Sequence, residues 1–261
     1  MTPRIPGHVA PPTAADGHRD ARSATTNRLL EDGYVILSAE QGAAVLSVDR
    51  AQLQTLPASW DDLPRDQYLR DGGRYRSRRH ACFIQEFRAG QPPELSRTPQ
   101  RAHWQPVSYN ALHGGLERWF EPIAAPLLAT PVWGALLGAI GSLFQQIRGV
   151  ARWYIEAHQF RIDTAGGIGR PTPEGAHRDG VDFVALLLVR RHHVRGGETR
   201  VFDANGTAGV RFTMREPWSM LLLDDARVIH ETTPIQPDGA DGVRDTLVLT
   251  YRSAGFQAPA L

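Results

Sequence analysis

His177 and Asp179 stand two residues apart in the segment EGAHRDGVDF, and imidazole and carboxylate groups are common metal ligands. In an extended strand alternate side chains point to the same face, so these two would lie on one side of the chain, about 6.5–7 Å apart at Cα. The best third ligand is His230 in RVIHETTP, on a later strand-length run. Two histidines and one carboxylate leave one face of an octahedron open, as non-haem iron(II) oxygenases require. The sequence therefore predicts a metal centre built from these three residues.

The His-Arg-Asp tripeptide also occurs at residues 18–20, so the tripeptide alone carries little information. The copy at His177 follows the turn sequence PTPEG and precedes VDFVALLLV, a buried-strand pattern. A protein-kinase catalytic loop is excluded because Val184 stands where that loop needs asparagine. The other copy falls in residues 1–26, which are rich in Pro, Ala, Gly and Thr and show no period. We expect these residues to form a flexible, solvated arm.

Residues 27–261 are predicted to form a single domain whose first part, residues 27–149, is mostly helical support. A short helix is expected to lead into a strand at Tyr34–Leu37, and AEQGAAVLSVDRAQLQTL carries apolar residues at helical spacing. The arginine-dense segment RDGGRYRSRRHACF is expected to be a loop. Two helices are predicted between Gly115 and Ile147, with a break at Pro131, because proline starts helices well and continues them badly.

Residues 150–255 are predicted to be the β core that carries the metal site. Strand-length runs rich in Val, Ile, Leu, Thr and aromatic residues alternate there with Gly, Pro, Asp and Asn turns. The runs are ARWYIEAHQFRID, VDFVALLLVRR, ETRVFDA, WSMLLLD, RVIHETTPI and RDTLVLTYR. Six or more short strands joined by turns indicate a jelly roll or barrel. The predicted fold class is therefore mainly β with flanking helices.

The composition is that of an ordinary globular enzyme: 261 residues, of which 41% are hydrophobic and 22% are charged. The net charge of +1 favours neither nucleic acid nor a membrane surface as a partner. Cys82 is the single cysteine, which excludes an internal disulfide and fits a reducing cytoplasm. The N-terminus lacks the apolar core of a secretory signal, and no uncharged apolar run approaches the roughly 18 residues of a membrane span.

The segments PTPEGAHRDGVDFVALLLVRR, GGETRVFD, LLLDDARVIHETTPIQP and RDTLVLTYR resemble the bacterial 2-oxoglutarate/Fe(II) dioxygenases that hydroxylate free amino acids, of the L-isoleucine 4-hydroxylase type. The resemblance is strong over residues 150–253 and weaker upstream. It implies a double-stranded β-helix, which is a cupin-like jelly roll, and a metal triad of His177, Asp179 and His230. It also implies Fe(II), 2-oxoglutarate as co-substrate, and O₂, with no catalytic side chain beyond the metal ligands.

A co-substrate that chelates iron through its 1-carboxylate and 2-keto oxygen leaves its far carboxylate in need of a buried partner, which arginine's planar fork suits well. Arg244 begins the run RDTLVLTYR, and Thr246 shares its face and can donate a second hydrogen bond. This Arg-x-Thr pattern after the distal histidine is similar to the co-substrate anchor of the superfamily. Arg252 has the same strand parity but falls at the far end, so it is the weaker candidate. An ordinary salt bridge is the alternative role for either arginine.

Three residues are candidates for substrate binding. Gln159 and Arg161 share a face of a run that resembles the first core strand of the family, and Arg161 could hold a substrate carboxylate or be a surface arginine. Glu198 follows two glycines, which permit a tight turn, and could reach an amino group at the rim of the pocket. Glu156 and His158 form a competing His/carboxylate pair, which we expect to be structural because no turn motif frames them.

The resemblance implies a hydroxylase that acts on an unactivated C–H bond of a free L-amino acid or close derivative and converts 2-oxoglutarate to succinate and CO₂. Its expected partner is this small molecule, without nucleic acid or membrane. The first alternative is the same chemistry on a carrier-bound or peptide intermediate, by hydroxylation, desaturation or cyclisation. The second is a cupin-like metal protein that is not an oxygenase. The anchoring arginine discriminates between them, because only a 2-oxoglutarate enzyme needs it.

Overall fold

A sheet of seven antiparallel strands runs through the centre of the protein, whose structure is a computed structural model that describes residues 14–259. The strand order is β1-β9-β5-β12-β4-β2-β3. The strands are β1 (Tyr34–Leu37), β2 (Arg76–Glu86), β3 (Glu94–Arg97), β4 (Arg152–Asp163), β5 (Phe183–His192), β9 (Met220–Asp224) and β12 (Val243–Arg252). The Val-, Leu- and aromatic-rich runs that predicted β4, β5, β9 and β12 therefore form the middle of this sheet.

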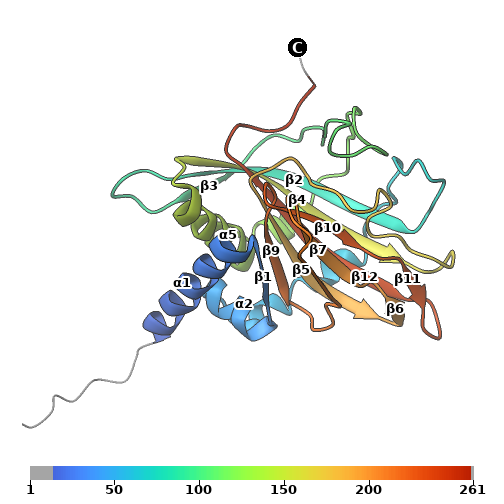
Figure 1. Cartoon of the computed structure of the whole chain (residues 1–261), viewed down its shortest axis with the longest axis horizontal. Helices are drawn as coiled ribbons and strands as arrows, with labels where there is room; N and C mark the ends of the chain where they lie inside the picture. Colours follow the sequence, from blue (N-terminus) through green and yellow to red (C-terminus); the bar gives the residue numbers. More distant parts are fainter. Residues whose placement is uncertain (1–13, 260–261) are drawn as a thin grey trace, which may run out of the picture.

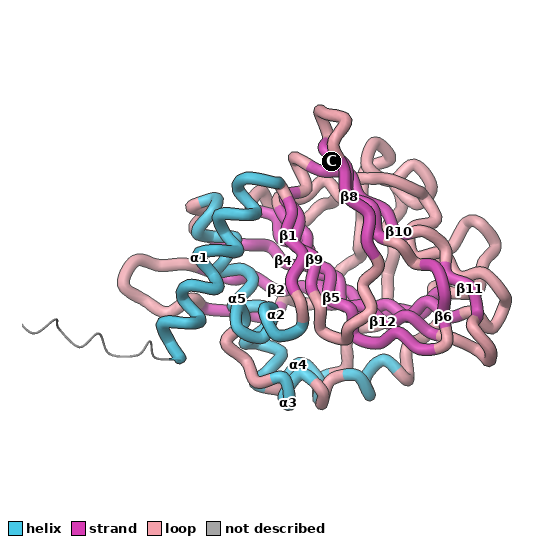
Figure 2. Tube along the Cα trace, turned by 60° about the horizontal axis from the view of Figure 1, so that its bottom comes forward, coloured by secondary structure: helices cyan, strands magenta, loops and turns pink. Residues whose placement is uncertain are grey.

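Two smaller sheets lie on the other side of the molecule from the helices (Figure 2). One has the order β10-β7-β8, with β10 at Val228–Thr232, β7 at Thr199–Asp203 and β8 at Gly209–Phe212. The other pairs β11 (Ile235–Pro237) with β6 (Val194–Gly196). A large antiparallel sheet facing a smaller one is the two-layer arrangement of a jelly roll, so the predicted fold class is confirmed.

The helices pack against the large sheet (Figure 1). They are α1 (Ala14–Asp32), α2 (Ala39–Leu46), α3 (Arg50–Leu53), the 3-10 turn η1 (Pro57–Trp60), α4 (Ala125–Leu128) and α5 (Pro131–Arg148). Of these, α1, α2 and α5 gather at one end of the molecule (Figure 1). The longest apolar helix, α5, begins at Pro131 as predicted and ends at Gly149, which adopts the left-handed φ of 65° that favours glycine. None of the described helices is both long and apolar enough to cross a membrane.

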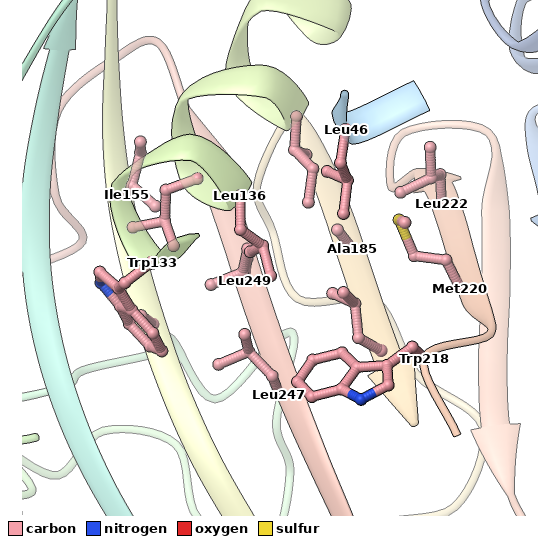
Figure 3. Packing of buried hydrophobic residues seen from close by; sticks show 14 of the residues in the cluster. Leu46, Trp133, Leu136, Ile155, Ala185, Trp218, Met220, Leu222, Leu247 and Leu249 are labelled. Atoms are coloured by element: carbon pink, nitrogen blue, oxygen red, sulfur yellow. The ribbon is translucent and has the colours of Figure 1, made fainter. Parts of the chain in front are cut away.

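Helix α5 packs on the large sheet through a buried apolar layer. Trp133 and Leu136 of this helix lie against Leu247 and Leu249 of β12 (Figure 3). The odd-numbered residues of β4 and β12 thus face the helices, and the even-numbered residues face the smaller sheets. This alternation decides which side chains can reach a site between the two layers.

The register of three neighbouring strands places polar residues in rows on the side away from the helices. Arg244 of β12 pairs with Ile162 of β4, which pairs with Arg76 of β2. The next row on this face contains Thr246, Phe160 and Arg78. Arginines on β2 and β12 therefore share one face, separated by a single strand.

Three expectations about the N-terminal half need correction. The arm predicted for residues 1–26 is a helix from Ala14 on, while residues 1–13 lie outside the described residues. This helix docks on α2: His18 Nδ1 lies 2.6 Å from the carbonyl oxygen of Ala44, so this copy of His-Arg-Asp has a structural role. Two helices, α4 and α5, flank the predicted break at Pro131, but the first is short, because residues 115–124 are not helical.

The third correction concerns β2, which lies in the segment expected to be an arginine-dense loop and pairs with β4 along its full length. The strand was not predicted because its arginines do not match the apolar pattern of a buried strand. Arg76 and Arg78 are nevertheless buried, since Asp66 lies 2.7 Å from Arg76 Nε and 3.9 Å from Arg78 Nη1. Residues 27–149 therefore contribute the strands β1, β2 and β3 to the large sheet as well as helices.

Candidate active site

His177, Asp179 and His230 meet at one point between the two layers. Asp179 Oδ1 lies 3.9 Å from His177 Nε2, and Asp179 Oδ2 lies 3.7 Å from His230 Nε2. One ligand atom from each of the three residues lies within 4.8 Å of the other two. The structure thus brings the three predicted ligands together, and their donor types suit a divalent first-row metal.

The backbone around His177 orients its ring. His177 Nδ1 lies 2.9 Å from the carbonyl oxygen of Gly175, whose φ of 81° completes the PTPEG turn. A donor at Nδ1 leaves Nε2 with the lone pair that a metal needs. Burial lowers the pKa of His230 to about 3, which favours the neutral imidazole that can bind a metal. At His177 burial acts in the same direction, but the negative charges of Asp179 and Glu174 outweigh it and raise the pKa. The arrangement fits a metal ion.

Two further side chains hold Asp179 in place. Gln105 Nε2 donates a hydrogen bond of 3.1 Å to Asp179 Oδ1. The carboxylate of Asp225 accepts hydrogen bonds from the backbone N–H groups of Asp179, Gly180 and Val181, at 3.0, 2.8 and 3.1 Å. Hydrogen bonds of this kind fix the orientation of a ligating carboxylate. The sequence carried no signal for either residue, since both lie in irregular segments.

Arg244 and Thr246 line the same cavity as the three ligands. Arg244 is only 2% exposed, and its Nε and Nη2 atoms are buried without a hydrogen-bond partner. Among the described residues, no carboxylate lies within ion-pair distance of it. Burial lowers the pKa of Arg244 to about 10, so the group stays charged at neutral pH. Such an unpaired buried guanidinium is suited to an anionic ligand, because its desolvation is otherwise uncompensated.

Arg252 lies on the same face of β12 but beyond this cavity. It lines a neighbouring pocket and donates a hydrogen bond of 2.7 Å to the carbonyl oxygen of Gly255. Asp179 also lines this neighbouring pocket, but His177 and His230 do not, so Arg244 is the arginine that shares a cavity with all three ligands.

None of the three residues expected to bind substrate lines the cavity. Gln159 and Arg161 are odd-numbered residues of β4 and face the other side of the sheet. Gln159 Nε2 donates to Ser59 Oγ at 2.9 Å, and Arg161 is held by Asp61 and Asp245. Glu198 is bound to Arg200 at 2.9 Å. Gln159 and Arg161 share one face of the strand, as predicted, but this face points away from the cavity. Alternation shows which residues share a face and does not show which face lines the cavity.

A second cluster of potential metal ligands surrounds Glu156. Its members, all buried, are His80, His103, Glu156 and His158. His103 Nδ1 lies 2.5 Å from Glu156 Oε2, and the Nε2 atoms of His158 and His80 lie 3.5 and 3.6 Å from it. Three imidazoles and a carboxylate are a donor set that can bind iron.

Arg78 determines which ring nitrogen of one member of this cluster, His158, carries the hydrogen. Its Nη2 atom lies 2.7 Å from His158 Nδ1, and because a guanidinium only donates, Nδ1 must accept. His158 Nε2 then carries the hydrogen and points it at Glu156. Glu156 and His158 thus belong to one buried polar cluster, and their structural role stays a prediction.

A jelly-roll core that brings two histidines, one aspartate and an unpaired arginine to one cavity is the arrangement of the non-haem iron oxygenases. The family model of the 2OG-Fe dioxygenases matches residues 57–250, and the chain belongs to this family. The members of this family use Fe(II), 2-oxoglutarate and O₂. None of the curated proteins matches the chain significantly.

Several solved structures have a similar fold. A BsmA homologue from Methylobium petroleophilum PM1 is 54% identical, with a TM-score of 0.86 over 92% of this chain and 96% of that one. The fold is also similar to that of IDO from Bacillus thuringiensis, at 16% identity and a TM-score of 0.71 over 89% of this chain and 99% of that one. The Fe(II)/α-ketoglutarate-dependent dioxygenase TqaL has 18% identity and a TM-score of 0.67, over 90% of this chain and 89% of that one.

Proposed function

We propose that the protein hydroxylates an unactivated C–H bond of a free L-amino acid or close derivative, while 2-oxoglutarate is decarboxylated to succinate. His177, Asp179 and His230 hold the iron, and Arg244 with Thr246 binds the far carboxylate of 2-oxoglutarate. The observation that carries this proposal is the buried, unpaired guanidinium of Arg244 in the same cavity as the three ligands. A cupin-like metal protein that is not an oxygenase has no need of such a group.

The side chains of the cavity divide the work between them. Bound iron and 2-oxoglutarate supply the oxidising power, with O₂ as the oxidant. Gln105 and Asp225 keep the Asp179 carboxylate and its turn in one orientation. Apolar residues of β5, β9 and β12, such as Leu186, Leu223 and Val248, cover the cavity floor and exclude water.

The amino acid substrate and its L-isoleucine-like character rest on the resemblance of residues 150–253 to amino acid hydroxylases. A carrier-bound or peptide substrate for the same chemistry is the alternative. We also propose a cytoplasmic location, which the single buried Cys82 favours.

Anaerobic titration with Fe(II) and 2-oxoglutarate tests the proposal. We expect a weak visible charge-transfer band in the wild type and its loss in His177→Ala. The matched control is His18→Ala, which removes the histidine of the identical tripeptide on α1. This variant keeps the band and loses about 1 kcal/mol of stability with its hydrogen bond to Ala44. Absence of the band in the wild type at saturating Fe(II) contradicts the proposal.

A further inference from the structure

Arg118 and Glu174 are charged groups on the cavity wall for which the proposed metal and co-substrate leave no partner. Among the described residues, no carboxylate lies within 4.0 Å of the Arg118 guanidinium, and no arginine lies that close to the Glu174 carboxylate. In the part of the chain that the structure describes, the one basic side chain within ion-pair distance of the Glu174 carboxylate is His177, whose Nε2 lies 3.6 Å from Glu174 Oε1. Since that nitrogen is a proposed metal ligand, it cannot neutralise the carboxylate.

The other arginines of the cavity already have partners. Arg76 forms a 2.7 Å ion pair with Asp66. Arg78 lies between the rings of Phe120 and Phe160, 3.7 and 4.4 Å from their centroids, and donates to His158. Arg244 is the proposed anchor of 2-oxoglutarate. One positive and one negative group therefore remain for the substrate.

Both groups have an unused polar atom in the buried wall. Arg118 is 2% exposed; its Nη2 donates to Gln105 Oε1 at 2.9 Å, and its Nε has no partner. The side chain of Glu174 is 12% exposed, and its Oε2 atom is buried without a partner. A buried donor and a buried acceptor left unpaired are costly, so a ligand that carries both complementary groups would be favoured.

The two groups also adjoin the metal centre. Glu174 lies beside His177, and Arg118 is connected to Asp179 through Gln105, whose Oε1 accepts from Arg118 and whose Nε2 donates to Asp179. Burial lowers the pKa of Arg118 to about 10. The negative charge of Glu174 opposes this fall, so the two side chains are close enough to interact electrostatically. A ligand bound to both would lie close to the iron.

We infer that the site recognises the zwitterionic head of a free α-amino acid, with the carboxylate on Arg118 and the ammonium group on Glu174. This inference rests on the proposed function and sharpens it, since a peptide-bound or carrier-bound residue lacks one or both charges. Arg118 and Glu174 are then specificity-determining residues that hold the substrate head while its side chain carries the C–H bond.

Neutralising the ligand tests this without changing the protein. The twenty proteinogenic L-amino acids are scored by the succinate they release from the Fe(II) enzyme with 2-oxoglutarate. The best one is compared with its methyl ester and its N-acetyl derivative in titrations of the anaerobic charge-transfer band. We expect each derivative to bind at least about 30-fold more weakly. Equal affinity of either derivative overturns the inference and leaves the proposed function standing. No response to any amino acid while the band forms also overturns the inference, and of the proposed function it leaves the iron and 2-oxoglutarate chemistry without the free amino acid substrate.

Variants then assign the two charges. The penalty is the Kd of a derivative divided by the Kd of the free amino acid. In Arg118→Met the penalty for the methyl ester falls below about 3-fold, and in Glu174→Gln the penalty for the N-acetyl derivative falls below about 3-fold. Each variant lacks the partner that would distinguish the two ligands. Arg97→Lys and Glu117→Gln, at exposed positions, keep both penalties. If Glu174→Gln instead weakens Fe(II) binding and keeps the N-acetyl penalty, Glu174 serves the metal and the inference is wrong. If the wild type forms no band, the proposed function itself fails.

Discussion

His177 and His230 lie directly opposite each other as a hydrogen-bonded antiparallel pair, and each N–H donates to the carbonyl oxygen of the other at 3.0 and 2.9 Å. Their ring centroids are 4.6 Å apart. The backbone therefore sets the separation of these two candidate ligands before any metal binds. A site prepared in this way needs little reorganisation, which favours affinity.

Replacement of Arg244 is expected to weaken 2-oxoglutarate binding selectively. In Arg244→Met the Kd for 2-oxoglutarate, measured by anaerobic titration of the Fe(II) protein, should rise at least about 30-fold, because a buried carboxylate loses its charged partner. Arg252→Met is the matched control, since Arg252 lies on the same face of β12 and binds Gly255 instead. It should change the Kd by less than about 3-fold. If Arg252→Met raises the Kd more than Arg244→Met does, Arg252 is the residue that binds the far carboxylate of 2-oxoglutarate.

Gln105 is expected to tune the metal site through Asp179. In Gln105→Leu the carboxylate loses a hydrogen bond, so we expect Fe(II) affinity to fall by about 10- to 100-fold. Gln257→Leu is the control, because Gln257 Nε2 donates to the backbone carbonyl of Asp179 and not to its carboxylate. Competition against a fluorescent chelator measures both variants. Unchanged affinity in Gln105→Leu would show that Asp179 is oriented without it.

The protein is expected to bind one equivalent of Fe(II), although two clusters carry suitable donors. Arg78 donates to His158 Nδ1 and so places a hydrogen, rather than a lone pair, on the ring nitrogen that faces Glu156. Metal analysis after anaerobic loading and desalting should give one iron in the wild type and in Glu156→Gln, and none in His177→Ala/His230→Ala. A second equivalent that disappears only in Glu156→Gln would assign a metal to the Glu156 cluster.

Asp66 is expected to make the stability of the protein depend on pH. Burial alone would raise the pKa of its carboxyl group, but the positive charges of Arg76 and Arg78 outweigh burial and lower it. A lowered folded-state pKa contributes stability that is fully present above the unfolded value of 3.8 and is lost as the pH falls through the folded value.

Urea denaturation of Asp66→Asn tests this dependence. The variant should be about 3–5 kcal/mol less stable than the wild type at pH 7, because a buried ion pair is broken. This difference should shrink as the pH is lowered below about 4. Asp62→Asn, whose carboxylate is fully exposed 3.8 Å from Arg79, should stay within about 0.5 kcal/mol of the wild type. A gap that is constant over this range would refute the role of Asp66.

The sequence predicted the strands whose residues are mostly apolar and missed those whose burial depends on charge pairs. Runs such as VDFVALLLVRR identify themselves by composition, and α5 is marked by Pro131 and Gly149. The composition of β2 does not identify it as a strand, because Arg76 and Arg78 are buried only together with Asp66, a partner outside the strand.

The same distinction applies to the site. His177, Asp179 and His230 could be found because a turn and two strands frame them. Arg118 and Gln105 lie in an irregular segment, where neither periodicity nor a motif indicates which residues face the cavity. Glu174 belongs to the PTPEG turn, but a turn sequence does not indicate that its carboxylate lines the cavity with one oxygen unpaired.

The segment before Asp179 is attached to the smaller sheets at intervals. Gly169 pairs with Ile235, Thr172 Oγ1 donates to the carbonyl oxygen of Thr232, and His177 pairs with His230. A metal held by His177 and His230 would strengthen the last of these attachments. At a free metal concentration a thousand times its Kd, binding would add about 4 kcal/mol to the free energy of opening this segment. Amide hydrogen exchange should then slow by a similar factor at all protected positions of residues 169–177 when the metal binds. The metal site would thus also fasten this segment to the smaller sheets.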